Sequence, residues 1–190
     1  MLGALINDCS TIENLSQCYD VKTTIKCLQE CNIKIKKDNN GVKIIGGTLN
    51  VPVNPLDCKN SGSTARMLLG LLAGEGIPAK FEGDSSLSKR PMGRIISPMI
   101  EAGAVIEHND NCLPIQLKSG IKFPLNYNTK TKSAQVKSSL IFSALGLNDL
   151  SKISFNKNTR DHLEKLLKFI GYEIEIKDQI FIKKPFKPIN

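Results

Sequence analysis

Met99-Ile-Glu-Ala-Gly-Ala-Val-Ile-Glu107 decides the fold, because two other segments of the chain repeat its pattern. The counterparts are Leu28-Gln-Glu-Cys-Asn-Ile-Lys-Ile35 and Leu167-Lys-Phe-Ile-Gly-Tyr-Glu-Ile-Glu175. In each segment we expect a helix to end at Asn or Gly and an alternating strand to begin. The offsets between these turn residues are 71 and 68 positions. Such a period predicts one supersecondary unit that is used three times.

Three apolar, helix-like runs repeat with the same spacing, and each ends in small or polar residues; they cover residues 1–12, 67–77 and 140–153. The second and third runs follow a turn and a helix start, at 60–66 and 133–138, whereas the first has none. We therefore expect the sequence to lack a strand, a turn and a helix start before Met1, since an uncapped helix is poorly anchored. A naturally degenerate first unit is the alternative.

The remaining pattern gives each complete unit the order β-α-β-α-β-β. We expect helices, with Asp20 capping the first and Pro91 in the first turn of the third, at 21–31, 61–74, 91–102, 134–146 and 160–170. Alternation predicts strands near 33–35, 42–45, 79–82, 105–106, 113–117, 152–155, 172–176 and 180–183, with a hairpin turn at 39–41. Residues 119–132 are expected to form an extended crossing. Pro185 and Pro188 predict an extended end.

The predicted fold class is α/β (α+β), a pseudo-threefold repeat with the helices inside three sheets. All of residues 1–190 would form one domain. Its units are an incomplete first one at 1–50, a second at 56–118 and a third at 119–184.

Composition is that of an ordinary globular protein, with 41% hydrophobic and 23% charged residues. No apolar run approaches the ~18 residues of a membrane span. The net charge is +8, but the basic residues are dispersed and aromatic residues are only 5%. We therefore expect no nucleic-acid binding, because stacking platforms are scarce. Six cysteines without a Cys-x-x-Cys pair, and two separated histidines, predict buried thiols of a reducing cytoplasm and no metal site.

Asn60-Ser-Gly-Ser-Thr-Ala-Arg66 follows a predicted strand and opens a predicted helix. Gly62 allows close backbone approach to a ligand, and the free N–H groups of a helix N-terminus favour an anion. Arg66 lies one turn further on, where it could reach a carboxylate or brace the loop. Simple capping of the helix by Asn60 or Ser61 is the alternative.

Glu82-Gly-Asp-Ser-Ser-Leu-Ser-Lys-Arg-Pro-Met92 places two adjacent bases before a helix-starting proline. Lys89 and Arg90 are suited to hold a phosphate or carboxylate there. A solvated Lys-Arg pair is the alternative. In the third unit, Ser133-Ala-Gln-Val-Lys-Ser138 and Asn158-Thr-Arg-Asp-His-Leu-Glu164 occupy the equivalent positions. Four polar helix starts could therefore face one cleft and bind a small phosphorylated substrate.

At these residues the chain resembles the 5-enolpyruvylshikimate-3-phosphate synthase family. The family's Asn-Ser/Ala-Gly-Thr-x-x-Arg is matched at 60–66 and its Gly-Asp-x-Ser-Leu-x-x-Arg-Pro-Met at 83–92. Its Ser-Ala-Gln-Val-Lys-Ser stands unaltered at 133–138. Its Ser-Arg-Asp-His-Thr-Glu is met at 159–164 with two substitutions. The resemblance spans essentially the whole chain in the family's order.

The resemblance implies transfer of the enolpyruvyl group of phosphoenolpyruvate to the 5-hydroxyl of shikimate 3-phosphate, with release of phosphate, in aromatic amino acid biosynthesis. It implies a monomeric, cytoplasmic two-domain enzyme without a cofactor. This chain would be the N-terminal domain, and the second domain would follow Asn190. The acid/base groups would be a lysine before Met1 and acidic residues of the second domain. The chain by itself is therefore expected to bind substrates without turnover.

The resemblance also implies roles for individual residues. Shikimate 3-phosphate would be bound by Ser63, Ser133, Ala134, Gln135, Thr159 and Arg160. Phosphoenolpyruvate would be bound by Asn60, Gly62, Arg90 and Gln135. Structural roles near the site would fall to Arg66, Asp84 and Lys89. The resemblance also implies a target of the herbicide glyphosate, and Gly62, which does not narrow the phosphoenolpyruvate pocket, is compatible with that; the sequence does not decide the sensitivity.

Three other interpretations are open. The related UDP-N-acetylglucosamine enolpyruvyl transferases carry a reactive Cys in the loop that here spans Gly83 to Arg90; this loop contains no Cys, which argues strongly against that family. A nucleic-acid module built from similar units would bind RNA with a steep salt dependence. A non-catalytic interaction module would bind a protein partner and neither small substrate.

Overall fold

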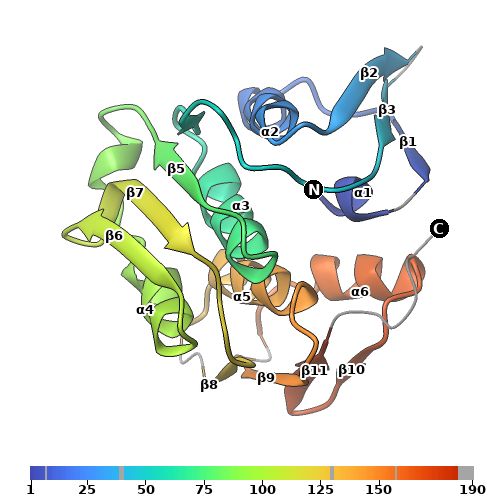
Figure 1. Cartoon of the computed structure of the whole chain (residues 1–190). Helices are drawn as coiled ribbons and strands as arrows, with labels where there is room; N and C mark the ends of the chain where they lie inside the picture. The colour runs from blue at the N-terminus through green and yellow to red at the C-terminus, as the bar shows by residue number, and fades with distance from the viewer. Residues whose placement is uncertain (7, 39–40, 129–130, 157, 184–190) are drawn as a thin grey trace.

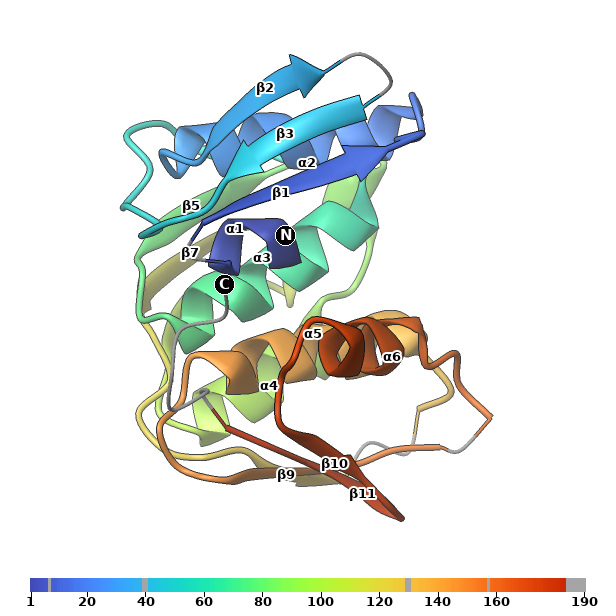
Figure 2. The same ribbon diagram turned by 90° about the vertical axis from the view of Figure 1, so that its right-hand side faces the viewer.

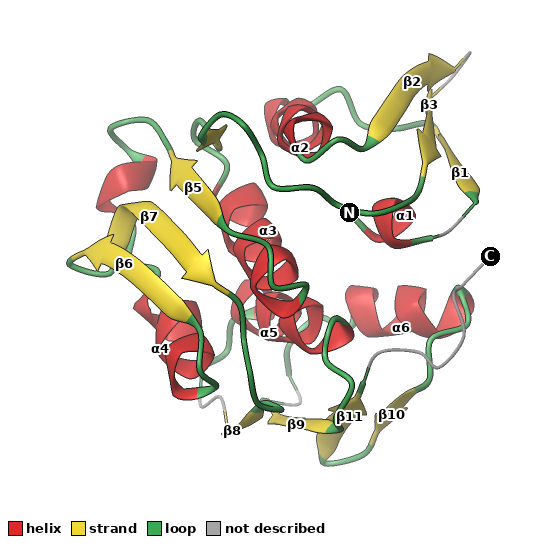
Figure 3. Ribbon diagram, in the orientation of Figure 1, coloured by secondary structure: helices red, strands yellow, loops and turns green. Residues whose placement is uncertain are grey.

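Three β-sheets lie on the outside of the fold and the helices lie between them (Figures 1 and 3). This arrangement is seen in a computed structural model that describes residues 1–6, 8–38, 41–128, 131–156 and 158–183. Each sheet belongs to one of the predicted units. Apolar residues on the inner faces of the sheets and on the helices form one continuous core. The predicted fold class, with its inward-facing helices, is confirmed.

The second unit contains all of its expected strands. In chain order its elements are β4 (Leu56–Asp57), α3 (Gly62–Gly74), β5 (Ala79–Glu82), the short 3-10 helix η1 (Leu87–Lys89), α4 (Gly93–Glu101), β6 (Val105–Asn109) and β7 (Cys112–Ser119). The strand order in the sheet is β4-β5-β7-β6. β4 and β5 are parallel because α3 forms the crossover between them, and the other pairs are antiparallel.

The third unit repeats this topology. Its elements are β8 (Asn126–Asn128), α5 (Ala134–Leu145), β9 (Ser151–Ser154), α6 (His162–Phe169), β10 (Ile174–Ile176) and β11 (Gln179–Ile182). The order β8-β9-β11-β10 is that of the second unit, and β8 is again parallel to β9. The segment 119–132, predicted only as an extended crossing, thus supplies the first strand of the unit.

The first unit has the same order without its first strand. It comprises α1 (Leu2–Leu5), β1 (Cys9–Glu13), α2 (Tyr19–Glu30), β2 (Lys34–Asp38) and β3 (Gly41–Ile45), with strand order β1-β3-β2. Only Leu2–Leu5 of the helix-like run predicted over 1–12 is helical, and no strand was predicted at its end. Residues 9–13 pair in antiparallel register with β3, because this stretch corresponds to β5 rather than to the helix before it.

Three helix starts also differ from the predictions. α2 begins at Tyr19 with Cys18 as its cap residue, so Asp20 lies in the first turn, where its charge favours the helix dipole. α4 begins at Gly93, and Pro91 precedes it because Met92 N–H donates to the Asn111 carbonyl (2.7 Å) in the neighbouring hairpin. α6 begins at His162, which leaves the 158–161 segment as a turn. The predicted features at Asn39, Asn40, Pro185 and Pro188 lie outside the described residues.

Helices α3 and α5 pack against each other at the centre of the fold (Figure 2). A Cβ atom at Gly70 would lie 2.2 Å from the Ser139 carbonyl oxygen, and one at Gly74 would lie 2.2 Å from that of Ser143. The two backbones therefore touch, which only glycine allows. The Ser139 hydroxyl donates to the Arg66 carbonyl across this contact (2.6 Å). The first turns of α3 and α5 are held side by side as a result.

Candidate functional site

Two serine-capped helix starts form the centre of the candidate site. Ser61 caps α3, and its hydroxyl accepts from the Thr64 N–H at 3.2 Å. Ser133 caps α5 in the same way, accepting from the Val136 N–H at 3.4 Å. Ser61, not Asn60, is therefore the cap, and Asn60 remains available for another role. The neighbouring N-termini together give a region that favours negative charge.

Gln135 joins the two helix starts through both ends of its amide. Its Oε1 accepts from Arg66 Nη1 at 2.9 Å, and its Nε2 donates to the Ser63 hydroxyl at 2.8 Å. Arg66 also donates to the carbonyls of Gly62 (3.4 Å) and Pro91 (3.3 Å). Arg66 thus braces three of the sequence motifs against one another.

A second network orients Arg90. Its Nη2 donates to Asn60 Oδ1 at 2.7 Å, and Asn60 Nδ2 donates to Asp84 Oδ2 at 2.8 Å. The other Asp84 oxygen accepts from the Leu87 (2.8 Å) and Ser86 N–H groups. These hydrogen bonds lower the pKa of the Asp84 carboxyl and keep it charged, and the bond from the Leu87 N–H has the largest effect. Lys89 lies on η1 with an exposed side chain and forms no ion pair among the described residues.

In the described part of the chain, the arginines of this region have no carboxylate partner. Among the described residues no ion pair includes Arg66, Arg90 or Arg94. Burial lowers the pKa of Arg66, and the positive charges of Arg90 and Arg94 lower it further. A Cβ at Gly62 would come within 2.7 Å of Arg66 Nη1 and 3.5 Å of Arg90 Nη1. Glycine therefore keeps open the space beside two guanidinium groups, where a bound anion would compensate their charge.

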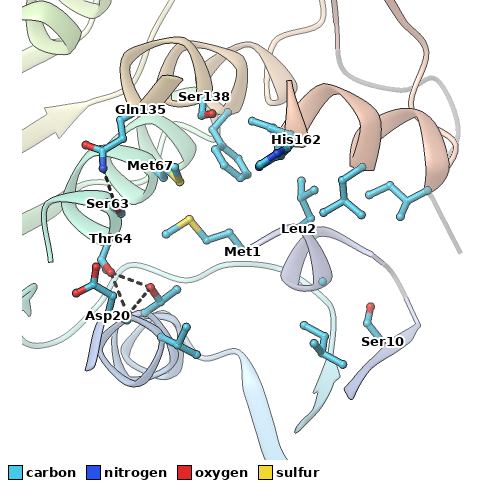
Figure 4. A pocket seen from close by; sticks show the side chains of 18 of the residues that line it. Met1, Leu2, Ser10, Asp20, Ser63, Thr64, Met67, Gln135, Ser138 and His162 are labelled. Carbon is cyan, nitrogen blue, oxygen red and sulfur yellow. Dashed lines mark hydrogen bonds between the residues drawn. The ribbon is translucent and has the colours of Figure 1, made fainter. Parts of the chain in front are cut away.

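A cavity of about 830 Å³ lies beside these helix starts (Figure 4). Four of the predicted site residues line it: Ser63, Ala134, Gln135 and Arg160. The structure thus brings together the first, third and fourth motifs on one wall. Asn60, Gly62, Arg90, Ser133 and Thr159 do not line the cavity. The Thr159 hydroxyl instead donates to the Asn156 carbonyl at 2.8 Å and holds the turn before α6.

The opposite wall comes from the first unit, where the sequence analysis identified no site residue. Asp20, Thr24 and Met1 lie there, and Thr24 Oγ1 is 2.7 Å from Thr64 Oγ1 across the cavity edge. His162 also faces the cavity (Figure 4). The sequence predicts Asp20 only as a helix cap, because nothing in the pattern around it indicates a binding site. Its place on the cavity wall is seen only in the folded chain. Within the described ranges no group of three His, Cys, Asp or Glu side chains could hold a metal ion. No described helix could cross a membrane.

Comparison with known proteins gives one consistent result. A family model described as EPSP synthase (3-phosphoshikimate 1-carboxyvinyltransferase) matches residues 1–187. A 3-phosphoshikimate 1-carboxyvinyltransferase of Caldicellulosiruptor saccharolyticus is 41% identical over 179 residues, which are 92% of this chain and 41% of that protein. Its counterpart in Vesicomyosocius okutanii subsp. Calyptogena okutanii is 39% identical over 179 residues, with the same coverage.

A solved structure agrees with these sequence matches. EPSP synthase from Acinetobacter baumannii superimposes with a TM-score of 0.90 at 28% identity, over 98% of this chain and 44% of that one. The chain therefore spans about two fifths of the length of the curated relatives that it matches.

Proposed function

Because the chain belongs to the EPSP synthase family, we propose that it supplies the substrate-binding surface of a 3-phosphoshikimate 1-carboxyvinyltransferase. The reaction would transfer the enolpyruvyl group of phosphoenolpyruvate to the 5-hydroxyl of shikimate 3-phosphate and release phosphate. The observation that carries the proposal is the position of Gln135. Its amide is bonded to Ser63 and Arg66, it lines the cavity, and the Arg66 guanidinium beside it forms no ion pair among the described residues.

Shikimate 3-phosphate would occupy the cavity. Gln135 and Ser63 offer an amide and a hydroxyl to its ring hydroxyls, and the exposed Arg160 offers a guanidinium to its phosphate. Ala134 would contact the ring. Ser133, the cap residue of α5, would also contact the ligand. The Thr159 hydroxyl is already bonded within its turn, which supports a role in orienting Arg160.

Phosphoenolpyruvate would bind beside the same wall, in the space that Gly62 leaves open. Arg90 would hold it through charged hydrogen bonds, oriented by Asn60 and Asp84. Gln135 would lie between the two substrates. The cytoplasmic location, the monomeric state of the enzyme, its sensitivity to glyphosate and the absence of nucleic-acid binding remain predictions.

Calorimetric titration of the 190-residue chain with shikimate 3-phosphate tests the proposal. We expect binding that weakens on the order of tenfold in Gln135→Ala and in Arg160→Ala, because each removes a hydrogen bond to the ligand. Lys80→Ala is the matched control, since it breaks an exposed ion pair with Glu82 (2.7 Å) on a sheet outside the cavity. Absence of binding by the folded parent chain, or equal binding by all variants, would contradict the proposed site.

A further inference from the structure

A buried ion pair connects the two helices that carry the third and fourth motifs. Lys137 Nζ on α5 lies 2.5 Å from Glu164 Oε1 on α6. The two side chains are 0% and 1% exposed. The ammonium group also lies 4.7 Å from the centroid of the Phe155 ring, within reach of a cation–π interaction. Apart from this pair, Lys137 Nζ and both Glu164 oxygens have no hydrogen-bond partner among the described residues.

Such a pair is a weak source of stability, because the removal of two charges from water offsets most of their attraction. It is nevertheless a strong constraint on geometry. If α5 and α6 moved apart, each charge would be left buried without a counter-ion, and the cost of an uncompensated charge rises steeply. The relative position of the two helices is therefore held within narrow limits.

The position of the pair relates it to the candidate site. Lys137 lies two residues after Gln135, and its N–H donates to the Ser133 carbonyl at 3.1 Å in the first turn of α5. Glu164 lies in the first turn of α6, four residues after Arg160, which is in the turn that precedes this helix. Within the part of the chain that the structure describes, no other side-chain hydrogen bond or ion pair joins α5 to α6. Gln135 and Arg160 line the cavity, whereas neither charged partner does.

We propose that the Lys137–Glu164 ion pair is a positioning device. It sets the distance between the first turn of α5, which carries Gln135, and the turn before α6, which carries Arg160. This inference rests on the proposed function, in which one shikimate 3-phosphate molecule is held by both turns. The ligand's ring and its phosphate are joined covalently, so both turns can bind only at one separation. The ion pair fixes that separation before the ligand arrives, which lowers the entropic cost of binding. Lys137 and Glu164 act through Gln135 and Arg160 and do not contact the ligand.

The decisive variant is Lys137→Met combined with Glu164→Leu in the 190-residue chain. Apolar replacement of both partners leaves no buried charge, so we expect a melting temperature equal to or above that of the parent. We also expect the dissociation constant of shikimate 3-phosphate to rise about tenfold or more as the preorganisation is lost. Lys165→Ala is the matched control, because it breaks the exposed pair between α6 and its cap residue Asp161 (3.1 Å). Unchanged affinity in the double variant would overturn the inference.

A second readout needs no ligand. Amide hydrogen exchange at Val136, whose N–H is bonded to Ser133, should become several-fold faster in the double variant. Exchange at Thr64, the equivalent amide of α3, should not change. If the parent chain binds no shikimate 3-phosphate, the proposed function fails and this exchange comparison alone decides the inference. Unaltered exchange at Val136 would then refute it.

Glu164→Asp provides a milder change if the double variant does not fold. The shorter side chain withdraws the carboxylate from Lys137 by one methylene while it keeps both charges. We expect weaker binding of shikimate 3-phosphate in this folded variant and faster exchange at Val136. Parent-like values of both quantities would contradict the inference.

Discussion

Gly70→Ala should separate α3 from α5 and so affect both stability and the site. The new Cβ would lie 2.2 Å from the Ser139 carbonyl oxygen and 2.8 Å from its hydroxyl. Ordinary van der Waals contact requires the backbones to move apart by about 1 Å. Overpacking of this kind costs ~1–3 kcal/mol, and the better helix propensity of alanine returns up to ~1 kcal/mol. Because the Ser139 carbonyl belongs to the backbone of α5, it cannot rotate away as a side chain would. We therefore expect the free energy of unfolding to fall by about 2 kcal/mol and the melting temperature by ~4–8 °C.

The same displacement should weaken ligand binding. Arg66 lies one helical turn before Gly70 on α3. The displacement would stretch its 2.9 Å hydrogen bond to Gln135 beyond hydrogen-bonding distance. Loss of a hydrogen bond to a charged group is worth ~1.5–3 kcal/mol, so the affinity for shikimate 3-phosphate should fall about tenfold or more. Urea unfolding and calorimetry measure the two effects separately.

Gly74→Ala is the matched control for this prediction. Its Cβ would meet the Ser143 carbonyl oxygen at the same 2.2 Å, but one helical turn further from Gln135. We expect a similar loss of stability and a smaller loss of affinity. A Gly70→Ala chain with the stability and affinity of the parent would show that the two backbones do not touch as described.

Two further substitutions address the phosphoenolpyruvate side of the site, measured by calorimetry with shikimate 3-phosphate present. Gly62→Ala should weaken phosphoenolpyruvate binding on the order of tenfold, because the methyl group would displace Arg66 Nη1, 2.7 Å away, and crowd Arg90; parent-like affinity would contradict this packing. Asn60→Ala should free Arg90 from its link to Asp84 and weaken phosphoenolpyruvate binding several-fold, with shikimate 3-phosphate binding retained. Equal losses for both substrates would show that the two networks are not separate.

The fold was largely predictable because its signals are local and repeated. The turn residues Asn32, Gly103 and Gly171 all have positive φ (67°, 91° and 89°), as a helix end that leads into a strand requires. Where the repeat was incomplete the prediction failed: without a preceding strand to align, residues 9–12 were included in the polar end of a helix-like run, and the strand β1 was missed. Short strands such as β8 gave no signal, since three residues are too few to show alternation.

The candidate site was predictable in its motifs but not in its contacts. Hydroxyls, glycine and arginine at helix starts mark anion binding wherever they occur, so residues 60–66 and 133–138 could be selected from sequence. The hydrogen-bond partners of these residues could not be predicted from sequence, because Gln135 is 69 positions from Arg66 and 72 from Ser63. Asp20 and Thr24 belong to a unit without such a motif. Their place on the cavity wall follows only from how the first unit packs on the other two.

The repeat itself explains why distant motifs meet. α3 and α5 are equivalent crossover helices, so each presents a capped N-terminus after a parallel strand. The two helices pack through Gly70 and Gly74, whose spacing of four residues aligns them on one face. Any two units joined through these helices would place their capped starts side by side. An anion site at the junction therefore requires only that the residues at those starts be polar or basic, which is the case for Ser63, Arg66 and Gln135.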